Sequence, residues 1–155
     1  LTGLLNRRAL EERLKRLKQH SRSKQNAFIL CDLDFFKQIN DQYGHKVGDV
    51  ALQHVTEIIS KAVRKYDEIC RMGGEEFLIL LQDTPPDIAI QVAERIRSSI
   101  ETTPLIQSGQ VISMTGSFGI SFLQHFDEFS QAAQQADLLL YQAKNLGRNQ
   151  LYWQQ

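Results

Sequence analysis

Residues 71–77 of this 155-residue chain read Arg-Met-Gly-Gly-Glu-Glu-Phe, and this stretch decides how the centre of the fold is built. Two glycines between two strand-like segments favour a tight hairpin, because glycine adopts the positive φ angles of such turns without a Cβ clash. The hairpin is expected to carry Glu75 and Glu76 at its tip. Adjacent carboxylates raise each other's pKa unless a cation lies beside them, so the pair predicts a bound divalent metal.

The composition indicates a single domain with no general affinity for nucleic acid. At this length, with 42% hydrophobic residues, the chain can bury one core and is too short for two ordinary domains. Lysine plus arginine and aspartate plus glutamate number 18 each, so no net charge attracts nucleic acid or an anionic bilayer. No apolar run approaches the roughly 20 residues that span a membrane, and the N-terminus has no signal-peptide pattern.

The two cysteines, Cys31 and Cys70, lie in apolar, strand-like segments without the spacing of a metal site. Free cysteine in such a context behaves as a small core residue, so both are expected to be buried, reduced thiols. Reduced thiols indicate a reducing compartment, and we therefore expect a cytoplasmic domain.

Hydrophobic periodicity predicts helices and strands that alternate along the chain. The unbroken apolar run at 27–31 favours a strand that is covered on both faces and central in its sheet. The alternation over 111–123 favours a half-covered strand, and a last short strand is expected at 150–153. Helices are expected at 6–22, capped by Asn6, at 35–43, at 48–62, at 85–100, and from Phe129 to a stop at Gly147.

These elements predict an α/β fold of the layered α+β kind. Its centre is expected to be a mixed five-stranded sheet, ferredoxin-like and flanked by helices. One β-hairpin of this sheet carries the Gly-Gly-Glu-Glu turn.

Acidic residues at the end of the central strand form a candidate metal site. Asp32 and Asp34 lie two residues apart and are expected on one face, about 7 Å from each other. A hairpin paired to this strand would bring Glu75 alongside Asp32. With a backbone carbonyl such as that of Leu33, these carboxylates suit Mg²⁺, which prefers carboxylate and phosphate oxygens. For Asp34 we keep the alternative that it caps the following helix.

Several groups near the predicted element ends are suited to phosphate. The backbone amides of Phe35 and Phe36 stand at a helix start, where N–H groups favour anions. No P-loop motif is present, so a nucleotide would have to bind on another scaffold. Four cationic or polar side chains could also contact a triphosphate: Lys37, His45, Lys144 and Arg148. Taken singly, each of them is equally consistent with a solvated surface position.

Four ordered blocks of the sequence resemble the diguanylate cyclase (GGDEF) domain, in the variant whose signature reads GGEEF. The blocks are Leu-Thr-Gly-Leu-Leu-Asn-Arg-Arg at 1–8, Asp-Leu-Asp-Phe-Phe-Lys-Gln-Ile-Asn-Asp-Gln-Tyr-Gly-His at 32–45, the 71–77 stretch, and Ala-Lys-Asn-Leu-Gly-Arg-Asn at 143–149. The family condenses two GTP into cyclic di-GMP and two pyrophosphates. The resemblance implies a single GGDEF domain over 1–155 with a core like the palm of nucleotidyl cyclases, excised from a longer signalling protein.

Position by position, the resemblance implies roles for residues of this chain. The metal ligands would be Asp32, Glu75, Glu76 and the carbonyl of Leu33, binding two Mg²⁺ per GTP, or Mn²⁺ instead. Glu75, or a water beside it, would act as the base. Asn40 and Asp49 would read guanine, since a carboxylate accepts from guanine N1–H and N2–H₂, which adenine lacks. Phosphate would be bound by Lys144 and Arg148, with support from Lys37 and His45.

A second motif resembles the inhibitory product site of the family. Arg64-Lys65-Tyr66-Asp67 is an Arg-x-x-Asp with five residues between it and Gly73, and Arg95 is a further candidate contact. The alternative is a helix-end arginine that favours the helix dipole, followed by an aspartate in the next turn.

The resemblance thus implies an enzyme that works as a regulated homodimer. Its partners would be GTP, cyclic di-GMP as product and inhibitor, a second copy of the chain, and an upstream sensory domain. Membrane attachment of the full-length protein through a preceding segment is left open. The alternative is a catalytically silent module that binds cyclic di-GMP or GTP and regulates a partner.

Overall fold

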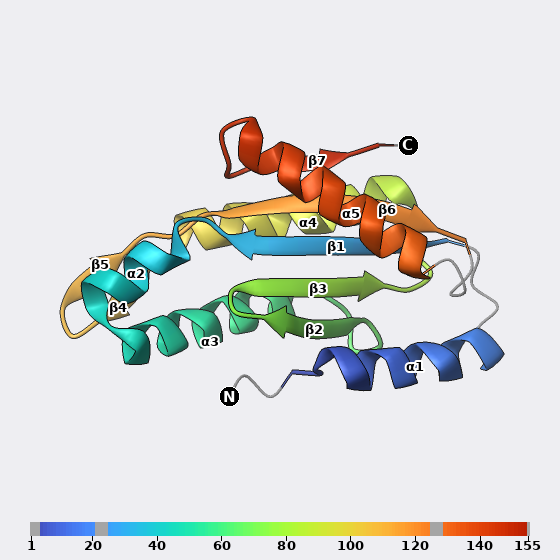
Figure 1. The fold of residues 1–155 in the computed structure, drawn as a ribbon, viewed down its shortest axis with the longest axis horizontal. Coiled ribbons are helices and arrows are strands. Elements are labelled where there is room, and N and C mark those ends of the chain that lie inside the picture. The colour runs from blue at the N-terminus through green and yellow to red at the C-terminus, as the bar shows by residue number, and fades with distance from the viewer. Residues whose placement is uncertain (1–3, 21–24, 125–128, 155) are drawn as a thin grey trace.

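A five-stranded mixed sheet forms the centre of the molecule (Figure 1). The computed structural model describes residues 4–20, 25–124 and 129–154. The strand order is β2 (Glu68–Gly73), β3 (Glu76–Leu81), β1 (Asn26–Leu33), β6 (Gly116–Leu123) and β7 (Leu151–Trp153). Strand β1 pairs antiparallel with β3 and β6, whereas β7 is parallel to β6. Every residue of β1 is buried, which confirms the predicted central strand and the mixed five-stranded sheet.

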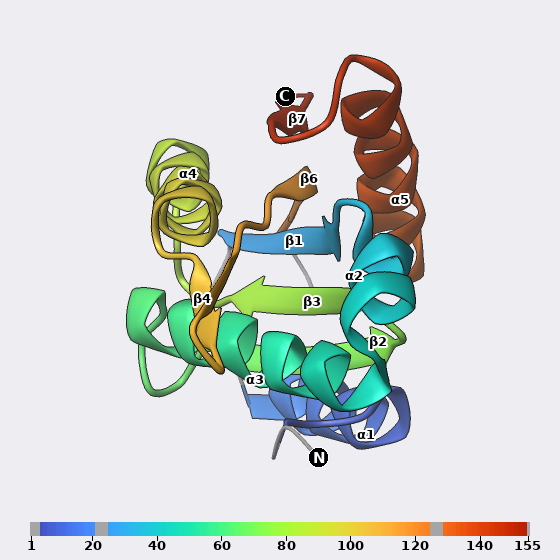
Figure 2. The same cartoon turned by 90° about the vertical axis from the view of Figure 1, so that its left-hand side faces the viewer.

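Helices cover both faces of the sheet, with α4 (Pro86–Thr102) and α5 (Phe129–Asn145) on opposite sides of the column of strands (Figure 2). Alternate residues of β1 point to the two faces. Ala27 and Ile29 share a core cluster with α4 and α3 (His45–Ala62), and Phe28 shares one with α1 (Arg7–His20) and α5.

The helix ends follow local capping signals. Asn6 caps α1 by accepting a hydrogen bond from Ala9 N at 2.8 Å, as predicted; the expected end of this helix at 22 lies outside the described residues. Helix α2 (Phe36–Tyr43) ends at Gly44, whose φ is 92°. Gly44 is also the N-cap of α3, which therefore begins three residues earlier than predicted.

The prediction of one half-covered strand over 111–123 is wrong. This segment contains the end of β5 (Gln110–Ile112), a break, and then β6. Strand β5 pairs with β4 (Leu105–Gln107) in a separate hairpin that the sequence analysis missed. At the break, Thr115 O accepts a hydrogen bond from Asp34 N at 2.9 Å, so this segment contacts the end of β1.

Helix α5 covers the face of β6 that carries Ser117 and Ser121, so this strand is not half-covered as predicted. Ser117 and Ser121 are buried, and Ser121 Oγ donates to Ala132 O at 2.6 Å. A Cβ at Gly119 would lie 2.1 Å from Ala136 O, so the helix approaches to backbone contact. Small residues therefore mark a close helix contact in this strand.

Cys31 and Cys70 are buried free thiols, as predicted. Within the described ranges, no helix has the length and apolar character needed to cross a membrane.

Candidate active site

The β2–β3 hairpin brings the GGEEF signature to the end of the central strand. Gly73 and Gly74 both have positive φ, 144° and 53°, as predicted. The turn itself lies at Gly74 and Glu75, because the pairing register shifts between Arg71 and Gly73. Arg71 Nε donates to Gly74 O at 2.9 Å and holds this turn.

The register places Glu76 directly opposite Asp32, and Glu75 lies one position further along, close enough for its charge to raise the pKa of Asp32. Glu75 is next to the following position, since its carbonyl accepts a hydrogen bond from Leu33 N at 3.3 Å. The position of Glu76 follows from the regular β1–β3 pairing, which runs without a shift from Ala27 opposite Leu81 to Asp32 opposite Glu76.

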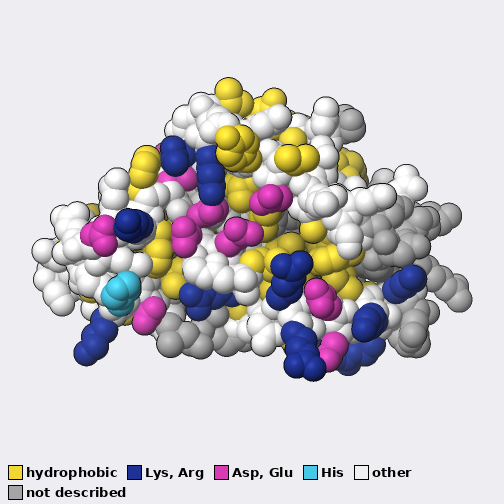
Figure 3. Space-filling model, viewed as in Figure 1, with side chains coloured by type: hydrophobic (Ala, Val, Ile, Leu, Met, Phe, Trp, Pro, Cys, Tyr) yellow, Lys and Arg dark blue, Asp and Glu magenta, His cyan; other side chains and the backbone are white. Residues whose placement is uncertain are grey.

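Burial and mutual repulsion disfavour the ionised forms of the carboxylates at this strand end. Asp32 is 8% exposed, and its Oδ2 lies 2.6 Å from Lys144 Nζ. Burial raises the pKa of Asp32 against the opposing effect of Lys144, and the charge of Glu75 adds to the rise. Burial also raises the pKa of Glu76, with further contributions from Asp32 and Asp137. Figure 3 shows acidic side chains gathered between α5 and the hairpin, next to basic ones.

The oxygen atoms at this strand end are of the kind that divalent cations such as Mg²⁺ prefer as ligands. The candidate donors are the carboxylates of Asp32, Glu75 and Glu76 and the carbonyl of Leu33. Over the described part of the chain, no three His, Cys, Asp or Glu side chains converge as a ready-made metal cluster. Lys144 is the cation beside Asp32 in this arrangement.

Asp34 has a structural role, but it does not cap α2. The N-cap of α2 is Phe35, and no side chain caps this helix. The carboxylate of Asp34 accepts hydrogen bonds from Thr115 Oγ1 at 2.7 Å, Ser117 Oγ at 2.6 Å and Asn149 N at 3.0 Å. It therefore joins the ends of β1, β6 and the segment after α5.

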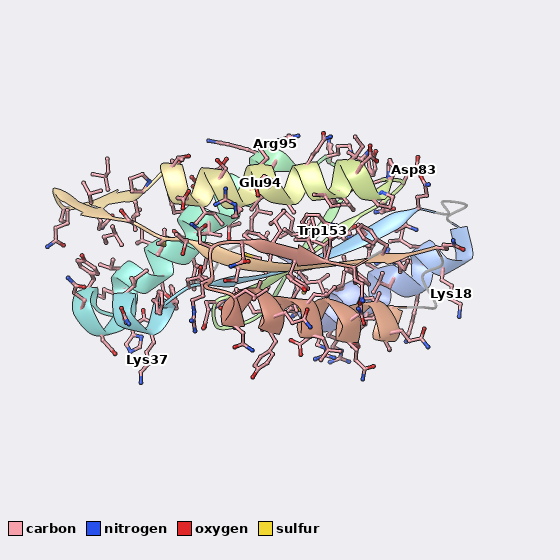
Figure 4. All side chains as sticks on the ribbon, turned by 90° about the horizontal axis from the view of Figure 1, so that it is seen from above. Lys18, Lys37, Asp83, Glu94, Arg95 and Trp153 are labelled. Atoms are coloured by element: carbon pink, nitrogen blue, oxygen red, sulfur yellow. The ribbon has the colours of Figure 1, made fainter. Side chains whose placement is uncertain are left out.

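A pocket of about 370 Å³ lies between α2, α3 and the hairpin turn. It gathers the predicted nucleotide-binding residues of two helices with the signature turn, and Lys37 extends from its edge (Figure 4). The lining residues are Phe36, Lys37, Asn40, His45, Asp49, Leu52, Arg71, Gly74 and Glu75.

The sequence analysis missed three residues that shape this pocket. Arg71 and Leu52 line it, and Arg71 stands in the signature stretch itself, two residues before the glycines. Gly48 leaves room for the present position of the Asn40 amide, because a Cβ at Gly48 would lie 1.8 Å from Asn40 Oδ1. Gly48 was predicted as the first residue of this helix, and in the structure it lies within α3, which begins at His45.

The residues that were predicted to bind phosphate, other than Lys37 and His45, lie around the start of α2 and the end of α5. Phe35 has a left-handed backbone, with φ 56°, and its ring is 55% exposed. The guanidinium carbon of Arg148 lies 4.8 Å from the centre of this ring. Lys144, on the last turn of α5, contacts Asp32 as described. The backbone amides of Phe35 and Phe36 precede a helix without a side-chain cap.

The Arg-x-x-Asp pair is assembled, but its carboxylate faces the protein. Asp67, 1% exposed in its side chain, accepts from the backbone N–H groups of Arg64 at 2.8 Å and Gln82 at 3.1 Å. The Arg64 guanidinium contacts Asp67, Gln82 O and Thr84 Oγ1. Arg95 is exposed on α4 (Figure 4) and has no hydrogen bond or ion pair to other described residues.

The sequence model of the diguanylate cyclase GGDEF domain matches residues 1–150 of this chain. The chain belongs to this family. It is 40% identical over 126 residues to Diguanylate cyclase A of Treponema denticola, covering 81% of this GGDEF domain and 34% of that protein. The chain thus spans about a third of the length of this relative.

Solved structures of GGDEF proteins share the fold. The diguanylate cyclase SiaD of Pseudomonas aeruginosa, in complex with its activator SiaC, superimposes with a TM-score of 0.90 at 37% identity. That match covers 99% of this chain and 60% of SiaD. The active GGEEF domain of a diguanylate cyclase from Vibrio cholerae superimposes with a TM-score of 0.85 at 31% identity, with 99% of both chains covered.

Proposed function

We propose that this GGDEF domain condenses two GTP molecules into cyclic di-GMP and two pyrophosphates. The observation that carries the proposal is the pocket in which Asn40 and Asp49 meet Glu75 of the signature turn. The carboxylates of Asp32 and Glu76 lie opposite each other next to this turn. A base-reading pocket and a site for phosphate chemistry are therefore contiguous.

Asn40 and Asp49 select guanine in this proposal. The Asp49 carboxylate accepts from N1–H and N2–H₂, and the Asn40 amide pairs with the remaining edge of the base. Adenine lacks both donors, so ATP would leave the carboxylate unpaired in the complex. We expect GTP to be preferred for this reason.

The reaction requires two copies of the domain, because each 3′-hydroxyl attacks the α-phosphate held by the other copy. Two O–P bonds form and two pyrophosphates leave. Glu75 accepts the hydroxyl proton, and Lys144 and Arg148 bind the phosphate groups. A divalent cation, Mg²⁺ or Mn²⁺, bound by Asp32, Glu75, Glu76 and the Leu33 carbonyl, supplies charge neutralisation at the attacked phosphate.

Product inhibition at Arg64 and Asp67, with Arg95 as a further contact, is part of the proposal. Because Asp67 is turned inward, Arg64 is the group that is accessible to a ligand, with 45% of its side chain exposed. Binding of cyclic di-GMP would exchange the Arg64 contacts with Gln82 and Thr84 for contacts with the ligand. Segments upstream of residue 1 would control how often two copies meet.

Incubation of concentrated protein with GTP and Mg²⁺ or Mn²⁺, followed by chromatographic analysis of the nucleotides, tests the proposal. Wild-type protein should form cyclic di-GMP and pyrophosphate, Glu75→Ala should form neither, and Arg64→Ala should form product with weaker feedback. A silent receptor would instead bind cyclic di-GMP and leave GTP unconsumed even as a confirmed dimer. That result would refute the proposed synthesis.

A further inference from the structure

The turn after α5 is held in an unusual backbone conformation. Gly147, Arg148 and Asn149 follow one another with φ of 119°, 63° and 48°. Glycine adopts such angles freely and asparagine tolerates them, but for arginine they are strained. Strained residues persist only where the surrounding structure holds them. The turn that carries Arg148 is closed by its own hydrogen bonds, Arg148 N to Ala143 O and Gln150 Nε2 to Arg148 O, both at 3.0 Å. It is also supported from outside.

Asn149 is the residue through which this support acts. Its backbone N donates to Asp34 Oδ2 at 3.0 Å, which ties the turn to the end of β1. Its side-chain Oδ1 accepts from Arg97 Nη1 at 2.9 Å, and its Nδ2 donates to the Glu101 carboxylate. Both side-chain partners belong to α4, on the opposite side of the sheet from α5.

Arg97 is itself fixed in one position on α4. Only 17% of its side chain is exposed, and its guanidinium is gripped by Glu94 through Nε at 2.9 Å and Nη2 at 2.5 Å (Glu94 is labelled in Figure 4). Glu101 lies 3.5 Å from its Nη1. A planar guanidinium held on two sides is a rigid support, since its fork of donors has a fixed geometry.

We propose that Arg97, through Asn149, positions the turn that carries Arg148 and so sets how tightly this domain binds the phosphate groups of its nucleotide. The inference rests on the proposed function, in which Arg148 contacts phosphate. Arg97 is a positioning residue: it reaches the nucleotide only through the turn. The competing explanation is that Arg97 merely fastens α4 to the C-terminal segment.

The test compares two ligands that share a base and differ in phosphate. The probes are 3′-deoxyguanosine triphosphate, which lacks the attacking hydroxyl and cannot condense, and 3′-deoxyguanosine, both titrated with Mg²⁺ present. Arg97→Ala should bind the triphosphate about tenfold more weakly, because misplacement of a charged contact is costly. It should bind the nucleoside within about twofold of wild type, since the base pocket belongs to α2 and α3.

Arg13→Ala is the matched control. Arg13 also joins a helix to another element through a carboxylate, Glu68 at 3.0 Å, but it lies on α1 away from the turn. It should change neither affinity. An Arg97→Ala protein that binds both ligands as wild type does, or loses affinity for both equally, would overturn the inference.

Asn149→Gly provides a second variant that does not depend on Arg97→Ala folding well. Glycine keeps the left-handed backbone and the N–H bond to Asp34, but it removes the contacts with Arg97 and Glu101. It should reproduce the selective loss of triphosphate affinity, and the double variant should be no weaker than either single one. Additive losses would overturn the inference. If wild-type protein shows no preference for the triphosphate, the proposed function itself fails, which is a distinct result.

Discussion

Replacing Gly48 by alanine should weaken nucleotide binding without lowering the stability of the fold. Gly48 lies in the first turns of α3, where its backbone N–H donates to Gly44 O at 3.1 Å. A Cβ there would lie 1.8 Å from Asn40 Oδ1, 3.0 Å from Asn40 Cγ and 3.3 Å from Phe36 Cζ. The first distance is impossible for a real contact, so the amide of Asn40 must rotate away from its present position.

The two energetic consequences have opposite signs. Alanine in place of glycine stabilises a helix by roughly 0.5–1 kcal/mol, which offsets the cost of moving the flexible end of Asn40. Loss of the Asn40 hydrogen bond to guanine should cost about 1–1.5 kcal/mol, or roughly tenfold in affinity. We therefore expect Gly48→Ala to melt at or above the wild-type temperature while binding 3′-deoxyguanosine triphosphate about tenfold more weakly.

Thermal unfolding and calorimetric titration of the same samples provide the assay, with Ser60→Ala as the control on the exposed side of α3. Ser60→Ala should leave nucleotide affinity unchanged. In an Asn40→Ala background the clash with the amide is absent and only the 3.3 Å approach to Phe36 Cζ remains, so Gly48→Ala should raise stability and cost no further affinity. Wild-type affinity in the Gly48→Ala single variant, or an equal loss of affinity in both backgrounds, would contradict the reasoning.

Three further predictions concern stability. Gly119→Ala should lower the free energy of unfolding by about 3 kcal/mol, because the new Cβ would clash with the backbone of α5. It would lie 2.1 Å from Ala136 O and 2.4 Å from Leu140 N. A loss below about 1 kcal/mol in urea denaturation would show that α5 can move away. Asp67→Ala should cost about 2–3 kcal/mol, since it leaves the backbone N–H groups of Arg64 and Gln82 without acceptors. Arg64→Ala, whose side chain is 45% exposed, should cost less, and equal losses would argue against this assignment. The pKa of Glu76 is raised above its ordinary 4.5, so the folded state binds the Glu76 proton more tightly than the unfolded chain does. The stabilisation of the folded state by protonated Glu76 is therefore lost as the pH rises through the raised pKa. Glu76→Gln should therefore increase the free energy of unfolding more at pH 7 than at pH 4, and a gain that is independent of pH would sink this explanation.

The sequence predicted those parts of the fold that depend on local periodicity. The run at 27–31 could be placed at the sheet centre because only a doubly covered strand tolerates continuous apolar residues. The serines of β6 misled the prediction, since small polar residues can lie either in water or beneath a close-packed helix. Gly119 decides between these cases, but its meaning depends on α5, which follows it in the chain.

The sequence predicted which residues line the candidate site, but it did not predict the register in which β3 pairs with β1. Residues of the signature stretch and of α2 and α3 do line one pocket. The position of Glu76 opposite Asp32 follows from how β1 and β3 pair, and residue types alone do not fix that register. The contact between Arg97 and Asn149 was not foreseen either, because the two residues are 52 positions apart and meet only in the folded chain.

The central strand explains how the domain keeps unfavourably placed charges at its site. Asp32 and Glu76 have raised pKa values, so their ionised forms cost stability at neutral pH. The preceding residues Phe28, Ile29 and Leu30 are almost fully buried, and each such side chain contributes about 1.5–3 kcal/mol. Their burial fixes the position of β1 against β3 and β6, and Asp32 is carried with it. The strand end cannot relax toward water without withdrawing these apolar side chains, so the carboxylates of Asp32 and Glu76 remain next to each other.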